Sequence, residues 1–150
     1  MDHSGKSPSE SETIRTEVVC PDDSNPLGIL LGGRLVEWMD VAAAVTAQLH
    51  SGKVCVTASI DKVKFIHSAK VGDIIIIKAK IHRAFNTSME IGLDAYVKEI
   101  STGDMKAVCR ALFYFVAIST GGEKSIVPPV VPVSEDEREK FENALKNRQS

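Results

Sequence analysis

The sequence predicts a single α+β domain in which one long helix is followed by a run of antiparallel strands. A mostly apolar helical segment comes early in the chain, and the segments after it alternate apolar and polar residues. These strand segments follow one another without intervening helices, which is typical of α+β and not of wound α/β folds. Because the helix is apolar on nearly all sides, we expect the sheet to curl around it. The 150 residues, 43% of them hydrophobic, suffice for one core.

The composition excludes several functional classes. A net charge of -2 gives no bias toward nucleic acid or an anionic membrane. No apolar run approaches the roughly 20 residues that span a bilayer, and the amino end has neither a signal-peptide core nor the composition of a transit peptide. The three cysteines show neither metal-ligand spacing nor a disulfide framework. We therefore expect a cytoplasmic protein without a metal, and without a nucleic-acid or membrane partner.

The amino-terminal part is predicted to contain a tail, a strand and the long helix. Residues 1–12 are rich in Ser and Glu and are predicted to be disordered. Thr13–Cys20 is predicted to be a strand, and a turn-rich loop leads to a helix over Gly32–Leu49. Gly52 is the expected helix stop.

The remaining strands complete a domain over residues 13–120. They are predicted at Val54–Phe65, Asp73–Arg83, Met89–Ile100 and Met105–Ile118. The apolar parity switches within the first of these, which indicates a β-bulge near Asp61 and Lys62. Residues 121–150 are predicted to be an extended segment followed by a loosely docked helix, with Ser134 and Glu137 as its capping box.

A carboxylate in the middle of the apolar helix, Asp40, is the first candidate functional group. Burying an isolated carboxylate is costly, so this residue needs a reason to be there. One alternative is structural, in which Asp40 caps a backbone group or pairs with Arg34. The other is catalytic, because a carboxylate serves as a general base or nucleophile. Gly32 and Gly33 open the helix, where free amides attract a developing oxyanion, although a glycine pair also suits an ordinary turn.

Four ordered motifs resemble the hotdog-fold acyl-CoA thioesterases: NPLGILLGGRLVEWMDVAA, VTASIDKVKF, VGD and RAFNTSMEI. Within this family the chain is similar to the single-domain bacterial YciA-type enzymes and to the tandem-hotdog cytosolic acyl-CoA hydrolases of animals, including the brown-fat-inducible kind. The resemblance covers roughly residues 18–116. It departs from the common pattern at Leu31, Ser68 and Asn86, where Phe, Pro and Arg are usual.

The resemblance implies a hotdog fold, with a long central helix wrapped by a five-stranded antiparallel sheet. It also implies a homo-oligomer, in which hotdogs pair as dimers and three dimers form a hexamer. The implied activity is hydrolysis of fatty acyl-CoA without a cofactor, coenzyme A being part of the substrate and product. Asp40 then acts as general base or nucleophile, Asn25 positions water or the carbonyl, and the amides of Gly32 and Gly33 polarise the carbonyl.

Coenzyme A contacts are implied for a second group of residues: Arg83, Asn86, Thr87 and Ser88. Thr57 and Ser59 are candidates for the pantetheine channel, with an ordinary strand surface as an equal alternative. An acyl-CoA-binding hotdog without activity remains an alternative function. A hotdog hydratase or dehydratase is disfavoured, because no histidine stands in the loop before the helix.

Overall fold

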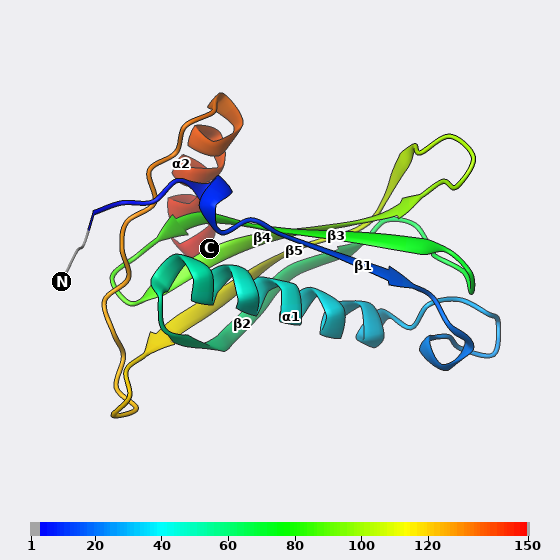
Figure 1. Ribbon diagram of the computed structural model, residues 1–150, viewed down its shortest axis with the longest axis horizontal. Helices are drawn as coiled ribbons and strands as arrows, with labels where there is room; N and C mark the ends of the chain where they lie inside the picture. Colours follow the sequence, from blue (N-terminus) through cyan, green and yellow to red (C-terminus); the bar gives the residue numbers. More distant parts are fainter. Residues whose placement is uncertain (1–3, 150) are drawn as a thin grey trace.

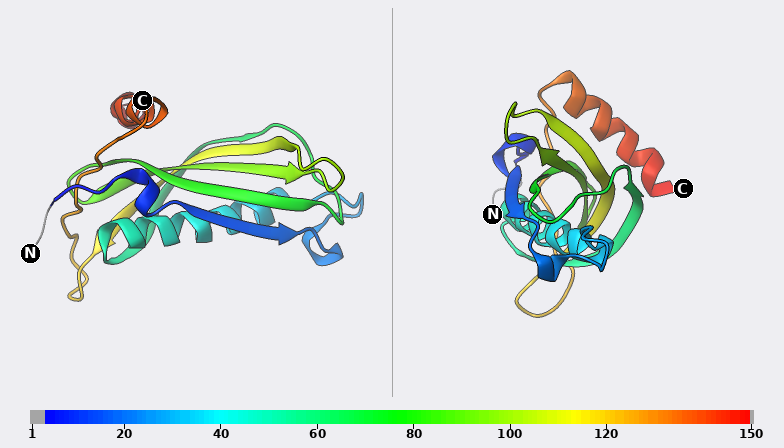
Figure 2. Two further views of the ribbon diagram at one scale, coloured as in Figure 1. Left: turned by 45° about the horizontal axis from the view of Figure 1, so that its top comes forward. Right: turned by 90° about the vertical axis from the view of Figure 1, so that its right-hand side faces the viewer.

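The computed structural model describes residues 4–149, and its centre is a helix lying along a curved sheet. The sheet is antiparallel with the strand order β1-β3-β4-β5-β2. Its strands are β1 (Thr13–Val18), β2 (Val54–Phe65), β3 (Ile74–Ala84), β4 (Ser88–Lys98) and β5 (Met105–Ile118). Figure 1 shows α1 (Gly32–Ser51) beside the strands, and the right-hand view of Figure 2 shows the sheet curling around it. The predicted α+β architecture is confirmed.

The helix α1 begins and ends close to the predicted positions. Gly52 adopts the left-handed conformation with φ 71°, and its N–H donates to Gln48 O at 2.8 Å, which stops the helix as predicted. The helix runs two residues further than expected, to Ser51. Its inner face contributes to the core a set of mostly apolar side chains: Leu35, Trp38, Met39, Ala42, Ala43 and Ala47.

The alternating residues of the central strands fill the space beneath α1. On β3 and β4 the fully buried apolar residues alternate along each strand: Ile75, Ile77, Ala79, Ile81, Met89, Ile91, Leu93 and Ala95. The predicted bulge in β2 is confirmed, because its register with β5 shifts between Asp61 and Lys64. Lys62, inside the bulge, has φ 53°, a conformation that few non-glycine residues adopt.

The prediction of a disordered amino-terminal tail is wrong for the part that the structure describes; residues 1–3 lie outside it. Pro8–Glu10 forms a 3₁₀ helix in which Pro8 is buried. Lys6 bridges to the extended carboxyl-terminal segment, with Lys6 N donating to Pro129 O at 3.0 Å and Val131 N donating to Lys6 O at 2.9 Å. Backbone pairing with a distant segment orders a stretch whose polar composition alone favours disorder.

The carboxyl-terminal helix α2 (Glu135–Gln149) packs against the outer face of the sheet, on the side away from α1 (Figure 2). Its capping box is confirmed: Ser134 Oγ accepts from Glu137 N at 3.1 Å, and Glu137 Oε1 accepts from Ser134 N at 3.2 Å. Docking is firmer than expected. Lys80 on β3 pairs with Glu137 at 2.7 Å, and the Arg83 guanidinium lies 3.9 Å from the Phe141 ring centre.

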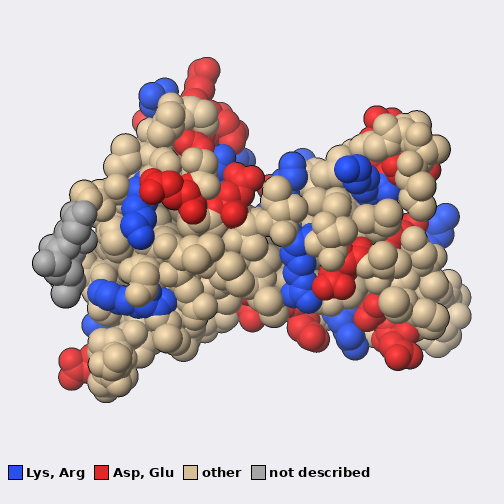
Figure 3. Space-filling view, viewed as in Figure 1, with Lys and Arg blue, Asp and Glu red and all other residues tan. Residues whose placement is uncertain are grey.

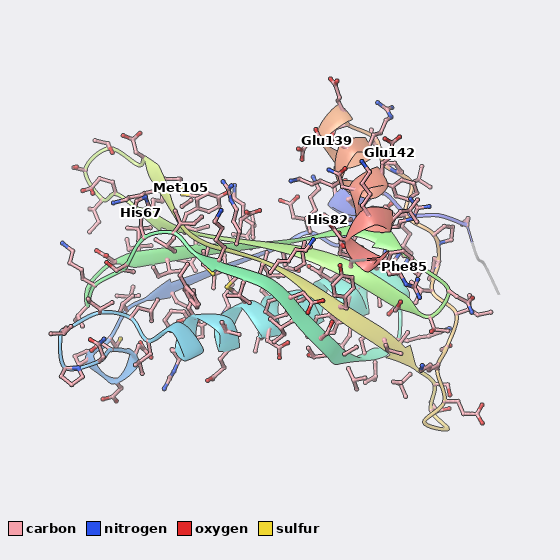
Figure 4. All side chains as sticks on the ribbon, turned by 180° about the vertical axis from the view of Figure 1, so that it is seen from behind. His67, His82, Phe85, Met105, Glu139 and Glu142 are labelled. Atoms are coloured by element: carbon pink, nitrogen blue, oxygen red, sulfur yellow. The ribbon has the colours of Figure 1, made fainter. Side chains whose placement is uncertain are left out.

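A buried carboxylate beneath α2 adds to this docking. Glu90 is fully buried and accepts hydrogen bonds from His82 Nδ1 at 2.7 Å, Tyr114 OH at 2.6 Å and Asn147 Nδ2 at 3.2 Å. Burial works to raise the pKa of Glu90, but the hydrogen bonds from His82 and Tyr114 outweigh it and leave that pKa lowered. The carboxylate therefore joins α2 to three strands on the outer face, close to the labelled His82 in Figure 4.

An apolar stripe is exposed on the side of α1 that does not pack into the core. It consists of exposed side chains on α1 and on the adjoining edge strand β2: Val41, Val45, Leu49, Val54, Val56 and Ile60. Figure 3 shows a broad area without charged residues over part of α1, whereas acidic and basic residues are interspersed elsewhere on that face. Asp40 lies next to this stripe.

Candidate active site

Asp40 projects from α1 toward the edge strand β2 and is half-buried. Thr57 Oγ1, on β2, donates a hydrogen bond of 2.8 Å to Asp40 Oδ1. The alternative in which Asp40 pairs with Arg34 is wrong, because Arg34 forms its ion pair with Asp23 at 3.1 Å. The structure thus gives Thr57 a partner that sequence reasoning missed. The two residues lie on different elements, and no local pattern links them.

The loop before α1 fixes the orientation of Asn25. Its side-chain oxygen accepts from the backbone N–H groups of Leu27 at 2.9 Å and Ile29 at 3.1 Å. Since two donors hold the oxygen, the amide nitrogen must face the other way, and it donates to no atom among the described residues. Asn25 is therefore oriented to present N–H donors, which can bind the oxygen of a carbonyl group or of a water molecule.

The first turn of α1 leaves its amides uncapped. The N-cap residue is Leu31, whose side chain makes no capping bond. No acceptor outside the helix receives the N–H groups of Gly32 or Gly33 in the part of the chain that the structure describes. Free first-turn amides and the positive end of the helix dipole favour a negatively charged oxygen. The pairing of Arg34 with Asp23, and the bond from Leu31 N to Asp23 O at 2.9 Å, hold the loop against this turn.

A cavity of about 380 Å³ opens beside Gly32. Its lining comes from the loop before α1, the first turn of α1, the end of β2 with the segment after it, and β5: Ile29, Leu30, Gly32, Leu35, Phe65, Ile66, His67, Ser68, Ala69 and Val108. Most of these side chains are apolar. Sequence reasoning did not identify this cavity, although the parity switch in β2 is a signal for a change in the direction of Phe65.

The predicted catalytic residues do not all meet within one chain. Asp40 follows Gly32 by two turns of helix, which is about 12 Å along the axis at the standard rise. Asn25 lies beyond the amino end of the helix, on the far side of Gly32. One chain therefore contains two separate groups. Asp40 and Thr57 form the first, and Asn25 with the free amides that follow its loop forms the second.

The residues predicted to contact coenzyme A at the turn between β3 and β4 lie at the other end of the sheet from the first turn of α1. The turn that holds Asn86 and Thr87 contacts the segment after β5, with Asn86 O accepting from Val127 N at 3.0 Å. Figure 4 shows Phe85 of this turn at the opposite end of the sheet from His67. Arg83 donates to Phe141 O at 3.0 Å, and the Ser59 hydroxyl donates to Asp61 at 3.3 Å. Within one chain these residues, together with Ser88, are not joined to Asp40.

The remaining titratable groups lie away from Asp40. Burial raises the pKa of the Cys109 thiol to about 11, in line with its fully buried position in the core. Burial lowers the pKa of His50, whose Nε2 lies 2.7 Å from Pro128 O at the far end of α1. Among the described residues, no group of three or more His, Cys, Asp and Glu side chains is placed to hold a metal ion. None of the described helices combines the length and apolar character needed to cross a membrane.

The fold and this site define a hotdog-type protein, and comparisons with known proteins identify its family. Residues 27–103, just over half of the chain, match the sequence profile of the Thioesterase superfamily. The chain belongs to this family. It is 30% identical over 128 residues to an acyl-CoA thioester hydrolase of Bacillus subtilis, covering 85% of this chain and 74% of the relative.

A longer relative is the mouse acetyl-coenzyme A thioesterase, 39% identical over 137 residues, or 91% of this chain. The chain spans about a quarter of the length of the mouse and rat proteins that it matches in this way.

Among solved structures, acyl-CoA hydrolase from Staphylococcus aureus, in complex with butyryl coenzyme A and coenzyme A, superposes with a TM-score of 0.93 at 31% identity. The match covers 96% of this chain and 88% of that one. A hexameric acyl-CoA thioesterase gives a TM-score of 0.93 at 33% identity, over 97% and 94% of the two chains. These matches confirm the hotdog fold.

Proposed function

We propose that the protein hydrolyses acyl-coenzyme A thioesters to a free acid and coenzyme A. The observation that carries this proposal is the hydrogen bond between Asp40 and Thr57, which lies beside an apolar stripe. Asp40 is on the same helix as the two uncapped amides of Gly32 and Gly33. A thioesterase needs a base or nucleophile together with donors for the oxyanion. Both are present among the side chains and amides of this chain.

In the proposed reaction, the thioester carbonyl lies against the amides at the start of α1. The N–H groups of Gly32 or Gly33 and the side-chain amide of Asn25 donate to its oxygen and stabilise the charge that develops there. Asp40 removes a proton from the attacking water, or attacks the carbonyl itself to form an anhydride that water then opens. In either route the C–S bond breaks and coenzyme A leaves as its thiol.

The geometry of one chain favours a site built by two copies. Asn25 and Asp40 are too far apart along α1 to reach one carbonyl from the same chain. A two-fold dimer joined along β2 and α1 would cover the apolar stripe and bring Asp40 of one protomer to the loop of its partner. It would also cover the unpaired edge of β2. We propose such a dimer, and a trimer of dimers as the complete assembly, because several relatives are described as hexameric.

Structures of variants of the Staphylococcus aureus acyl-CoA hydrolase support these roles. In three of them an asparagine, an aspartate or a threonine is replaced by alanine. The three residues stand along that chain with the same separations as Asn25, Asp40 and Thr57 in this one. A cytosolic location is part of the proposal, in keeping with a human relative, 32% identical, that is described as cytosolic.

Release of free thiol from a series of acyl-coenzyme A substrates tests the proposed reaction. Asp40→Asn should keep the fold and the assembly but lose at least ~100-fold in kcat, as is usual when a general base is removed. Asp104→Asn, in the exposed turn between β4 and β5, is the matched control and should keep full activity. Unchanged kcat in a well-folded Asp40→Asn protein contradicts the mechanism, and binding without thiol release by the unaltered protein indicates an inactive acyl-CoA-binding module.

A further inference from the structure

The cavity beside Gly32 has one wall in direct contact with the proposed carbonyl site. A Cβ atom added to Gly32 would lie 3.1 Å from Phe65 Cζ and 3.3 Å from Phe65 Cε1, and its three nearest atoms all belong to this ring. The Phe65 ring therefore lies directly against the side of Gly32 on which a side chain would stand. Any substituent that extends from a carbonyl group bound at Gly32 into the cavity passes this ring first.

The chemistry of the lining decides what the cavity accepts. Seven of the lining side chains are apolar, and neither Lys nor Arg is among them. The phosphates and the polar pantetheine arm of coenzyme A need charged and hydrogen-bonding partners, which this lining does not offer. An alkyl chain gains free energy from transfer out of water into such a cavity. Its volume of about 380 Å³ is large enough for a small-molecule group.

Phe65 is also a lining residue that can be replaced without disturbing the core. Its neighbours Leu35 and Val108 are buried in the core, whereas Phe65 is 57% exposed at the last position of an edge strand. It follows the bulge in β2, which changes the direction of side chains, and it stands opposite Cys109 of β5. Replacing it changes the cavity without emptying the core.

We propose that this cavity binds the acyl chain of the thioester and that Phe65 determines which chain lengths are accepted. This inference rests on the proposed thioesterase function. The ring narrows the passage between the amides of the first turn and the rest of the cavity. A smaller side chain at this position admits longer or bulkier acyl chains, and a larger one excludes all but the shortest.

The first test compares kcat/KM over a series of straight-chain acyl-coenzyme A substrates for the unaltered protein, Phe65→Ala and Phe65→Trp. Each methylene newly accommodated should raise kcat/KM by about fourfold. The optimum should therefore move to longer chains in Phe65→Ala, with about a fifteenfold change in the ratio of long to short substrates for two further methylenes. It should move to shorter chains in Phe65→Trp. Ile100→Ala, an exposed apolar residue in the β4–β5 turn, should leave the profile unchanged.

A second measurement does not depend on turnover. Calorimetric binding of non-hydrolysable alkyl-coenzyme A thioethers should show a chain-length preference that shifts with Phe65 in the same directions. If these shifts appear while no thioester is hydrolysed, the inference stands and the proposed hydrolysis fails. An identical profile in all three proteins overturns the inference. So does an equal loss at every chain length accompanied by weaker binding of coenzyme A itself, because the cavity would then hold the pantetheine arm.

Discussion

At the scale of single residues, the site depends on how two polar side chains are held. The Asp40 carboxylate has one hydrogen-bond donor among the described residues, Thr57, and that bond fixes its direction toward β2. The amide of Asn25 is oriented by two backbone N–H groups of its own loop. In the proposed reaction, each group would thus be positioned before substrate arrives, which would reduce the reorganisation needed.

Replacing Thr57 tests the positioning of Asp40. Thr57→Val removes the hydroxyl at nearly constant volume and should lower kcat by about tenfold, the equivalent of about 1.4 kcal/mol, as expected for a hydrogen bond to a charged group. KM should change little, and Thr57→Ser should restore kcat because it keeps the donor. A loss in Thr57→Val that Thr57→Ser does not rescue would indicate a packing role for the methyl group instead.

Sequence reasoning identified Asp40 and Asn25 but not their surroundings. The contrast between one carboxylate and its apolar neighbours marked Asp40, and the resemblance to the thioesterases marked Asn25. Sequence reasoning could not identify Thr57 as the partner of Asp40, because the two lie 17 residues apart on different elements. No periodicity within either element relates them. For Asn25, the direction of the side chain depends on the folded loop.

At the scale of elements, α2 shows how polar contacts dock a helix with few apolar residues. Its apolar stripe is short, which is why the sequence predicted loose docking. The structure adds the Lys80–Glu137 pair, the stacking of Arg83 on Phe141, and the hydrogen bond from Asn147 to Glu90. None of these contacts is local in sequence, so their contribution appears only in the folded chain.

Glu137 is a residue through which the docking of α2 is expected to depend on pH. The hydrogen bond from Lys80 lowers the pKa of Glu137, with further help from the backbone N–H groups of Val133 and Ser134. A carboxyl whose pKa is lower in the folded than in the unfolded state stabilises the fold above its unfolded pKa. That contribution is lost as the pH falls through the folded pKa.

Glu137→Gln should therefore lower the free energy of unfolding by about 1 kcal/mol at neutral pH, because it removes the charge that pairs with Lys80 while its amide oxygen can still accept the capping bonds. The deficit should shrink as the pH falls below about 4.3, the ordinary pKa of glutamic acid. Urea unfolding at a fixed protomer concentration and several pH values measures both effects. Glu139→Gln is the matched control, since Glu139 is exposed on the same helix (Figure 4). A deficit that stays constant from pH 7 to pH 3 would contradict the role of the charge.

At the scale of the whole molecule, the uncovered edge of β2 is a reason to propose a site shared between two chains. Within residues 4–149, β2 has a strand partner only on its β5 side, and the apolar stripe runs along its exposed face and that of α1. Exposed edges and large apolar areas are usually covered in proteins. A two-fold partner would cover both, and the proposed site requires the same contact.

Mixing two inactive variants tests this assembly. Asn25→Ala and Asp40→Ala proteins should each be nearly inactive but should regain activity after they are unfolded together and refolded. Random pairing makes about half of the dimers mixed, and each mixed dimer has one intact site and one doubly altered site. Recovery should therefore approach roughly a quarter of the unaltered activity.

The control is the same mixture without unfolding, with light scattering to establish that dimers are present. Mixed dimers as inactive as their parents would place the whole site within one protomer. A stable and active monomer at micromolar concentration would exclude the dimer altogether.

The sequence by itself determined the elements of this protein. The period of its apolar residues marked one buried helix and four long strands. The bulge in β2, the end of α1 at Gly52 and the start of α2 at Ser134 followed from local rules. Only the tertiary structure decided the strand order, the ordering of residues 4–12, the firm docking of α2, the pairing of Thr57 with Asp40, and the cavity beneath Phe65. The pattern of apolar residues along a chain indicates which side of each helix or strand is buried. The features decided by the tertiary structure depend instead on which distant element packs against that side.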